Sequence, residues 1–243
     1  MTITIPMRRS YNRATDDLRP VSIETNPLPH AEGSAYIKAG ETHVLCAATV
    51  EEEVPRWMKG RGTGWVTAEY ALLPRSTSTR TRRSSIEGGR TKEIQRLIGR
   101  SLRTAVDMKA LGERQIILDC DVIQADGGTR CAAITGAWVA LHHAVQGLVN
   151  RKKIRQTAMA RQIAAVSVGI VNGVPLLDLD YSEDSRADVD ANIVKTGNGD
   201  FVELQSTAEG APFGDDSLQT LLGLAATGID QLLAAQNDAI GAK

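Results

Sequence analysis

Two glycines, a threonine and an arginine stand together in the segment Ala125-Asp126-Gly127-Gly128-Thr129-Arg130. The segment follows an apolar run, residues 116–123, and precedes a stretch of helical apolar periodicity that begins near Ala132. At a strand-to-helix junction, glycines let backbone N–H groups converge, the helix N-terminus adds partial positive charge, and a guanidinium offers a forked donor. The pattern predicts an anion-binding loop. The same residues would also make an ordinary tight turn with a surface arginine.

Six acidic residues lie between positions 178 and 190, where Arg186 is the single basic residue. They follow a predicted strand, so we expect them in a loop. Carboxylates in such a loop can hold a hard cation such as Mg²⁺ or Mn²⁺ together with phosphate oxygens and water. One carboxyl group could instead donate a proton, because crowded carboxylates raise one another's pKa. The other interpretation is a solvated acidic loop.

Basic residues are concentrated elsewhere in the chain. Residues 56–103 contain twelve Lys and Arg against three acidic residues, although the formal net charge of the whole protein is −1. Most of the twelve are arginine, which recognises phosphate through a planar, forked set of donors. Combined with the anion-binding loop and the acidic cluster, this block favours phosphoryl chemistry on a polyanion.

Apolar patterning predicts one compact α+β domain. Strands are expected at 21–25, 34–38, 43–50, 65–73, 116–123, 163–171, 174–181, 191–195 and 201–205. Helices are expected at 93–109, at 132–148 and from Asp215 to near the C-terminus. The first of these helices places Arg96, Arg100 and Arg103 on one face. Asn172-Gly173, between two strand patterns, is a strong hairpin signal.

The composition is typical of a soluble globular protein, with 42% hydrophobic and 23% charged residues in a chain of 243. No uninterrupted apolar run reaches the roughly 18 residues of a membrane-spanning helix, and the first residues lack the apolar core of a secretory signal. We therefore expect a cytoplasmic protein without a membrane partner. Cys46, Cys120 and Cys131 are expected to be buried thiols, and the absence of a Cys-x-x-Cys motif argues against structural zinc.

Five motifs also occur in order along the chain: residues 73–77 (LPRST), 88–100 (GGRTKEIQRLIGR), 118–130 (LDCDVIQADGGTR), 165–170 (AVSVGI) and 203–210 (ELQSTAEG). Together they resemble the ribonuclease PH family, which is related to exosome core subunits and polynucleotide phosphorylase. The resemblance extends from Arg19 to the C-terminal helix. It implies a phosphate-dependent 3′→5′ exoribonuclease that trims the 3′ ends of tRNA precursors, releases nucleoside diphosphates and can run in reverse.

A fold and an assembly are implied by the same resemblance. The fold would be a single ribonuclease PH domain over residues 19–243, of the ribosomal-protein-S5-domain-2-like type, with mixed sheets packed with helices. Residues 1–18 would form an N-terminal extension. The partners would be RNA and further copies of the chain, usually arranged as a hexameric ring built from dimers.

Site residues follow by position from the matching motifs. Inorganic phosphate, the co-substrate, would be bound by Arg90, Gly128, Thr129 and Arg130. The paired aspartates linked to Mg²⁺ or Mn²⁺ binding and to acid catalysis would be Asp184 and Asp190, with Asp184 the first candidate for the acid. The catalytic set is therefore Arg90, Arg130, Asp184 and Asp190. Positions in or beside the RNA path are Arg75, Arg80, Arg96 and Arg100.

The match is not uniform, and two other functions remain open at this point. Cys131 and Ala133 stand where hydroxyl residues are expected, and the segment 81–87 is short for the family. A non-catalytic RNA-binding ring subunit would not need the four catalytic residues together. A hydrolytic, metal-dependent nuclease would use the carboxylates but would leave the Gly-Thr-Arg loop without a role.

Overall fold

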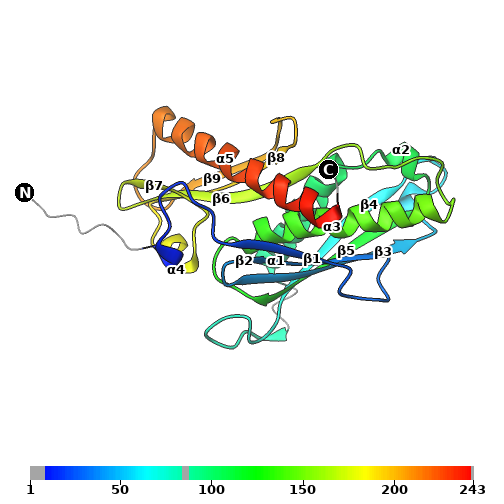
Figure 1. Ribbon diagram of the computed structural model, residues 1–243, viewed down its shortest axis with the longest axis horizontal. Helices are drawn as coiled ribbons and strands as arrows, with labels where there is room; N and C mark the ends of the chain where they lie inside the picture. Colours follow the sequence, from blue (N-terminus) through cyan, green and yellow to red (C-terminus); the bar gives the residue numbers. More distant parts are fainter. Residues whose placement is uncertain (1–8, 84–87, 242–243) are drawn as a thin grey trace, which may run out of the picture.

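The computed structural model describes residues 9–83 and 88–241 of the chain. It has the predicted α+β architecture, built on two sheets (Figure 1). The five-stranded sheet has the order β1-β2-β3-β5-β4, and the four-stranded sheet has the order β7-β6-β8-β9. The strands of the first sheet are β1 (Val21–Thr25), β2 (Gly33–Ala39), β3 (Thr42–Glu51), β4 (Trp65–Leu72) and β5 (Gln115–Gln124).

In the first sheet, β4 and β5 run parallel, whereas the other pairs are antiparallel. Alternate residues such as Ile37, Cys46 and Leu118 are fully buried and point toward the helices α1 (Gly89–Thr104) and α3 (Thr129–Asn150). Because α1 connects β4 to β5, the three elements form a βαβ unit. The carboxyl ends of β4 and β5 therefore lie at one edge of the sheet, and α1 and α3 both begin there.

The predicted helix at 93–109 is wrong at both ends. Helix α1 starts four residues earlier, at Gly89, and stops at Thr104. The side chain of Asp107 then accepts hydrogen bonds from the backbone N–H groups of Lys109 and Ala110 and caps a separate short helix, α2 (Met108–Leu111). An N-capping carboxylate favours a new helix start over continuation of the old one, which is why the apolar periodicity alone overran the boundary.

The second sheet consists of β6 (Ile163–Val171), β7 (Val174–Leu177), β8 (Val189–Thr196) and β9 (Phe201–Ala208). Asn172 and Gly173 join β6 to β7 with φ values of 52° and 76°, so the hairpin expected there is confirmed. The strand predicted at 174–181 ends at Leu177. Asp180 forms a capping box with Glu183 and starts a short helix, α4 (Tyr181–Asp184).

Helix α3 joins the two halves of the molecule. It is buried along most of its length and packs against β2, β3 and β6. The main core surrounds it, and a second core lies between the four-stranded sheet and helix α5 (Asp215–Ile240). Figure 1 shows α5 lying across that sheet. The three cysteines are free and buried, as predicted.

One helix has the length and composition of a membrane span, although the sequence contains no uninterrupted apolar run of that length. By length and composition alone, α5 could cross a bilayer. The helix meets this test because it carries few charges beyond its first turn. Its residues Leu221, Ala225 and Ile229 are buried in the second core, as expected of a helix that covers a sheet.

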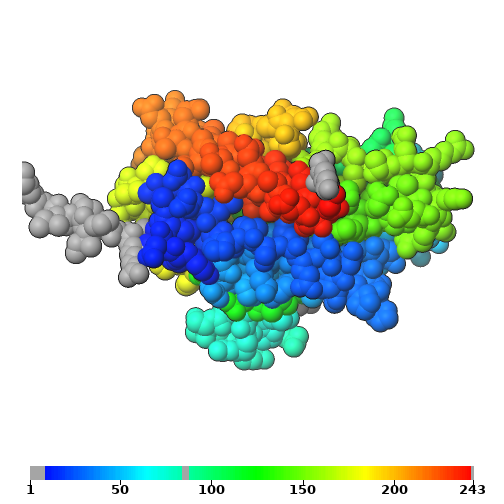
Figure 2. All heavy atoms as spheres, viewed as in Figure 1, coloured from blue at the N-terminus to red at the C-terminus, as the bar shows by residue number. Residues whose placement is uncertain are grey.

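Residues 9–18 of the predicted N-terminal extension lie against the rest of the chain, whereas residues 1–8 are outside the described part. Arg9 and Arg13 are 5% and 8% exposed. Figure 2 shows this segment, in dark blue, pressed against the atoms of both halves. The same figure shows a cyan protrusion, the loop that follows β4.

Candidate active site

The anion-binding loop predicted from the sequence lies between β5 and α3. Gly127 and Gly128 have φ values of 71° and 63°, a conformation that disfavours side chains. A Cβ atom on Gly127 would lie 2.5 Å from the carbonyl oxygen of Leu179, so the tight approach also requires glycine. Gly128 is the N-cap of α3, and no side chain in the described part of the chain caps the helix. The first N–H groups of α3 are thus available to an anion.

Thr129 has a hydrogen-bond partner within the protein. Its hydroxyl oxygen is 2.8 Å from the hydroxyl oxygen of Tyr70, which is 2% exposed at the end of β4. The pair ties the anion-binding loop to the neighbouring strand. Thr129 therefore contributes a backbone N–H group and a fixed loop position, with its hydroxyl group already engaged.

Arg130 and Arg90 come from the first turns of α3 and α1, which begin at the same edge of the first sheet. Nη1 of Arg130 donates to Oε1 of Gln205 at 2.9 Å and lies 3.5 Å from Oε1 of Glu93. Arg90 is exposed. Both arginines line a polar cavity of about 280 Å³, together with Asp184 and Asp190. The structure thus brings together all four residues of the predicted catalytic set.

The two aspartates reach this cavity from the second sheet. Asp184 is the last residue of α4, in a helix and not in the loop that we expected, and Asp190 lies near the start of β8. Burial raises the pKa of Asp184, although Arg90 and Arg130 oppose the shift. Burial, followed by the charge of Asp184, raises the pKa of Asp190 to about 6. Each carboxylate therefore makes ionisation of the other less favourable.

The donor set fits a hard divalent cation. Oδ1 of Asp190 is buried without a hydrogen-bond partner among the described residues, and Oδ2 accepts a hydrogen bond of 3.5 Å from Asn192. Within residues 9–83 and 88–241, no group of three or more His, Cys, Asp or Glu side chains could hold a metal ion. A cation at Asp184 and Asp190 would therefore take its other ligands from water and substrate phosphate oxygens, which suits Mg²⁺ or Mn²⁺.

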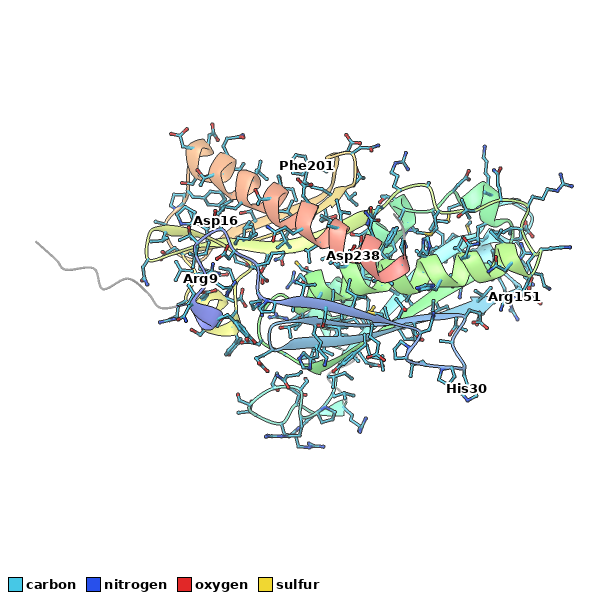
Figure 3. All side chains as sticks on the ribbon, viewed as in Figure 1. Arg9, Asp16, His30, Arg151, Phe201 and Asp238 are labelled. Atoms are coloured by element: carbon cyan, nitrogen blue, oxygen red, sulfur yellow. The ribbon has the colours of Figure 1, made fainter. Side chains whose placement is uncertain are left out.

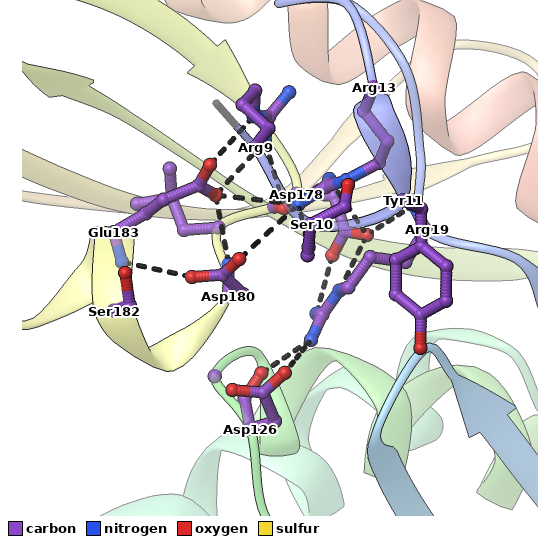
Figure 4. Close-up of polar contacts among 12 residues, drawn as sticks. Arg9, Ser10, Tyr11, Arg13, Arg19, Asp126, Asp178, Asp180, Ser182 and Glu183 are labelled. Atoms are coloured by element: carbon purple, nitrogen blue, oxygen red, sulfur yellow. Dashed lines mark hydrogen bonds and ion pairs between the residues drawn. The ribbon is translucent and has the colours of Figure 1, made fainter. Parts of the chain in front are cut away.

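The acidic segment is not one solvated loop. Asp178, Asp180 and Glu183 are 6%, 7% and 2% exposed and face buried arginines of the N-terminal segment (Figure 4). Burial would raise the pKa of Asp178, but the bonds from Arg19 outweigh it and hold that pKa below its usual range. The segment thus divides between structural ion pairs and the cavity. The local sequence does not reveal this division, because the arginine partners lie 159 to 174 residues away.

The arginines assigned to the RNA path lie in two places. Arg96 and Arg100 line a second hollow, of about 360 Å³, that shares Glu93 and Gln205 with the cavity. Nε and Nη2 of Arg100 each donate to Glu203 at 2.9 Å. Arg75 and Arg80 are exposed on the loop that follows β4. The loop that follows β4 is attached to the anion-binding loop by a hydrogen bond. The carbonyl of Ser76 accepts it from the backbone N–H of Ala125 at 2.8 Å.

Arg103, expected on the same helix face as Arg96 and Arg100, has a different environment. Its guanidinium carbon lies 4.5 Å from the ring centroid of Trp65, and Nη1 donates to the carbonyl of Val66 at 3.1 Å. It is half-buried against β4. Its role is therefore packing at the C-terminal end of α1.

Several cavity residues were not assigned from the sequence: Asn192, Gln205, Thr207 and Glu209. Asp190 pairs with Thr207 and Asn192 pairs with Gln205 across β8 and β9. Alternate residues of a strand share one face, so the alternation in the motif at 203–210 could have revealed these positions. Cys131, which stands in place of a hydroxyl residue, has its Sγ atom 3.2 Å from Oδ1 of Asn192 and donates to it. The thiol thus supplies one hydrogen bond at this position.

Paired arginines and paired aspartates around a polar cavity, on a two-sheet α+β fold, are the arrangement of an enzyme that handles phosphates. Two family profiles match the chain: "3′ exoribonuclease family, domain 1" over residues 17–145 and "domain 2" over residues 161–228. The chain belongs to the 3′ exoribonuclease family. Ribonuclease PH of Brucella ovis is 56% identical over 236 residues, which is 96% of this chain and 99% of that protein, and Ribonuclease PH of Brucella melitensis gives the same values.

Solved structures with lower identity share the fold. An Archaeoglobus fulgidus exosome with RNA bound to the active site has a TM-score of 0.79 at 22% identity, covering 93% of this chain and 91% of that one. Rrp46 of rice (Oryza sativa) has a TM-score of 0.76 at 20% identity, covering 96% of this chain and 100% of that one.

Proposed function

We propose that this chain is a phosphate-dependent 3′→5′ exoribonuclease that trims the 3′ ends of tRNA precursors and releases nucleoside diphosphates. The observation that carries the proposal is the polar cavity in which Arg90 and Arg130 face Asp184 and Asp190. The high identity to proteins named Ribonuclease PH supports the same activity. We further propose that it acts in the cytoplasm, without a membrane partner.

The attacking group in this reaction is inorganic phosphate, which is already anionic and needs no strong base. The reaction is opposed by electrostatic repulsion between this phosphate and the anionic phosphodiester that it attacks. Arg90, Arg130 and the N–H groups at the start of α3 offset that repulsion and hold the phosphate in line with the terminal phosphodiester. A new P–O bond forms as the bond to the O3′ oxygen of the preceding nucleotide breaks. A phosphoester is exchanged for a phosphoanhydride, so excess diphosphate drives the reverse reaction.

The departing O3′ oxygen needs a proton or an equivalent positive charge. Asp184 is the first candidate for the acid on family resemblance. In the metal-free site the pKa of Asp190 is about 6, higher than that of an ordinary aspartate, so Asp190 is a second candidate. In the alternative arrangement both carboxylates are ionised, and Asp184 and Asp190 would hold Mg²⁺ or Mn²⁺. When bound there, a divalent cation supplies positive charge beside the scissile phosphate.

The second hollow continues the cavity along α1, and we propose that it receives the RNA backbone. Replacing Arg96 and Arg100 together by alanine is expected to raise the KM for RNA roughly tenfold and to weaken its salt dependence, because two phosphate contacts are lost. The KM for inorganic phosphate should change little. Steady-state kinetics at several salt concentrations measure both effects.

Lys109→Ala serves as the control. It removes a positive charge from an exposed residue of α2, outside the second hollow, and so measures the effect of lost charge alone. An unchanged KM for RNA in the Arg96→Ala, Arg100→Ala variant would remove this hollow from the RNA path.

We also propose that the chain assembles as a hexameric ring built from dimers. Support comes from the fold that it shares with subunits of ring-forming assemblies; one solved neighbour is described as an archaeal exosome core. Light scattering on the purified protein gives its mass directly. A monomeric mass at micromolar concentration would contradict the ring.

The activity itself is tested by product analysis. Purified protein is incubated with a 3′-tailed RNA and Mg²⁺, with and without inorganic phosphate, and the released nucleotide is identified by chromatography. We expect nucleoside diphosphate that appears only with phosphate. Monophosphate released without phosphate would instead identify a hydrolytic nuclease. RNA binding without any release would identify a non-catalytic ring subunit.

A further inference from the structure

We propose that Arg19 is a positioning residue for phosphate binding, and that the N-terminal segment 9–19 clamps the anion-binding loop to helix α4. The inference rests on the proposed function, because it concerns the same cavity. It assigns an active-site role to a segment that contributes none of the cavity-lining residues. One arm of the clamp is Arg19, which holds the loop. The other is Arg9 with Arg13, which holds α4.

Arg19 is 2% exposed and makes a bidentate ion pair with Asp178. Nε donates to Oδ2 at 2.9 Å and Nη2 donates to Oδ1 at 2.7 Å, while the backbone N–H of Arg19 adds a bond to Oδ2 at 2.8 Å. The third guanidinium nitrogen, Nη1, donates to the carbonyl oxygen of Asp126, which lies in the anion-binding loop. One planar guanidinium thus joins the end of β7 to the anion-binding loop.

Thr42, the first residue of β3, also binds the anion-binding loop. Its hydroxyl group donates to the carbonyl oxygen of Gly127 at 2.6 Å and accepts from the backbone N–H of Asp126 at 3.0 Å. Nη1 of Arg19 lies 3.4 Å from the same hydroxyl oxygen. These contacts fix both peptide units that precede Gly128, and therefore the direction in which the first N–H groups of α3 point.

Helix α4 also contacts this loop, through its first residue, Tyr181. The backbone N–H of Tyr181 donates to Oδ1 of Asp126 at 3.1 Å. Asp126 therefore touches both the N-terminal segment, through Arg19, and the start of the helix that carries Asp184. Figure 4 shows Asp126 below the guanidinium of Arg19, with the carboxylates of Asp178 and Asp180 above it.

The second arm acts on α4 directly. Nε of Arg9 donates to Oε1 of Glu183 at 2.7 Å, and Nη2 of Arg9 donates to the carbonyl of Leu177 at 2.6 Å. Nη2 of Arg13 lies 3.4 Å from Oε2 of Glu183. Glu183 is part of the capping box of α4 and immediately precedes Asp184. The arm therefore fixes a one-turn helix that is too short to be stable alone.

This arrangement predicts different kinetic effects for the two arms. Disturbing the Arg19 arm should raise the KM for inorganic phosphate, because the loop N–H groups lose their alignment. Disturbing the Arg9 arm should instead raise the concentration of Mg²⁺ needed for half-maximal rate, because Asp184 is displaced. A clamp that served stability alone would lower the melting temperature and leave both constants unchanged at temperatures where the variant is folded.

The test uses full-length Arg19→Lys, Thr42→Val and Arg9→Lys variants, with Leu111→Ala as a control that removes buried apolar contacts in α2. Each is assayed below its own melting temperature for the KM values of phosphate and RNA and for Mg²⁺ dependence. We expect a roughly 10- to 100-fold higher KM for phosphate in Arg19→Lys and a smaller rise in Thr42→Val. For Arg9→Lys, we expect a shifted Mg²⁺ dependence.

The outcomes separate this inference from the proposed function. If the wild type releases no diphosphate, the function fails. If the wild type is active and Arg19→Lys and Thr42→Val both keep the wild-type KM for phosphate, the positioning role of Arg19 is overturned. Should Arg19→Lys fail to fold, Thr42→Val decides alone, because it removes the hydroxyl contacts to the loop without removing a buried charge. An equal rise in the KM for phosphate in Leu111→Ala would also overturn the positioning role of Arg19.

Discussion

Replacing Arg130 by alanine is expected to raise the KM for inorganic phosphate roughly 100-fold while the protein stays folded. Hydrogen bonds to a charged group contribute about 1.5–3 kcal/mol, and about 1.4 kcal/mol corresponds to a tenfold change in affinity. Arg130 lines the cavity beside the free N–H groups of α3, and its partners Gln205 and Glu93 are at the cavity wall. Initial rates measured against phosphate concentration at saturating RNA give the KM directly.

Arg151→Ala provides the matched control. Arg151 follows the last residue of α3, so it lies on the order of 30 Å from Arg130 along the same helix. Figure 3 shows it at the right-hand end of the molecule, with Arg9 at the other end. We expect wild-type kinetics from this variant. A phosphate KM that is unchanged in Arg130→Ala would show that Arg130 does not bind the attacking phosphate.

Replacing Asp190 by asparagine is expected to reduce kcat by roughly 10²- to 10⁴-fold, the range found when a catalytic proton donor is removed. The variant should also respond more weakly to added Mg²⁺, because one of the two aspartates proposed to hold the cation is gone. Product release measured across an Mg²⁺ titration tests both effects. A wild-type titration curve would count against a metal-binding role for Asp190.

The same substitution is expected to stabilise the metal-free protein at neutral pH. Burial and Asp184 raise the pKa of Asp190 to about 6 in the folded state, whereas an unfolded aspartate has a pKa of about 3.9. The folded protein therefore binds this proton more tightly. The free energy of unfolding falls as pH rises from about 4 to about 6, and the loss persists above that range.

Asparagine does not ionise, so the variant avoids this loss in the free energy of unfolding. We expect the difference to be about 1–2 kcal/mol, allowing for the partial exposure of Asp190 and its coupling to Asp184. In EDTA at pH 8, the melting temperature of Asp190→Asn should exceed that of the wild type by a few degrees. At pH 4 the difference should largely vanish. Asp188→Asn, an exposed change two residues away, is the control. A lower melting temperature for Asp190→Asn at pH 8 would contradict the raised pKa.

Much of the fold followed from local patterns in the sequence. Alternating apolar residues predicted most strands to within a few residues, because one face of each sheet packs against helices. The anion-binding loop was recognisable for a similar reason, since its glycines, helix start and arginine are adjacent in the chain. The grouping of Arg90 with Arg130 was suggested by family resemblance, and the βαβ unit now explains it physically, because both helices begin at one edge of the sheet.

The features that were missed depend on contacts distant in sequence. Nothing local separates Asp178, which binds Arg19, from Asp184, which faces the cavity. Both stand in the same acidic run, and only the tertiary fold supplies their different partners. The start of α4 was missed because Asp180 interrupts a strand-like pattern with a capping box, which four residues can form without any apolar periodicity.

The clamp between the N-terminal segment and α4 also bears on when a newly made chain becomes active. Arg9 and Glu183 are 174 positions apart, and Arg19 and Asp178 are 159 apart. Contacts that close such long loops form late in folding. Residues 9–19 therefore receive these partners only after residues 178–183 have been synthesised. A chain whose synthesis has not reached residue 184 can contain Arg90 and the anion-binding loop, but it lacks both aspartates of the cavity, so we expect it to be inactive.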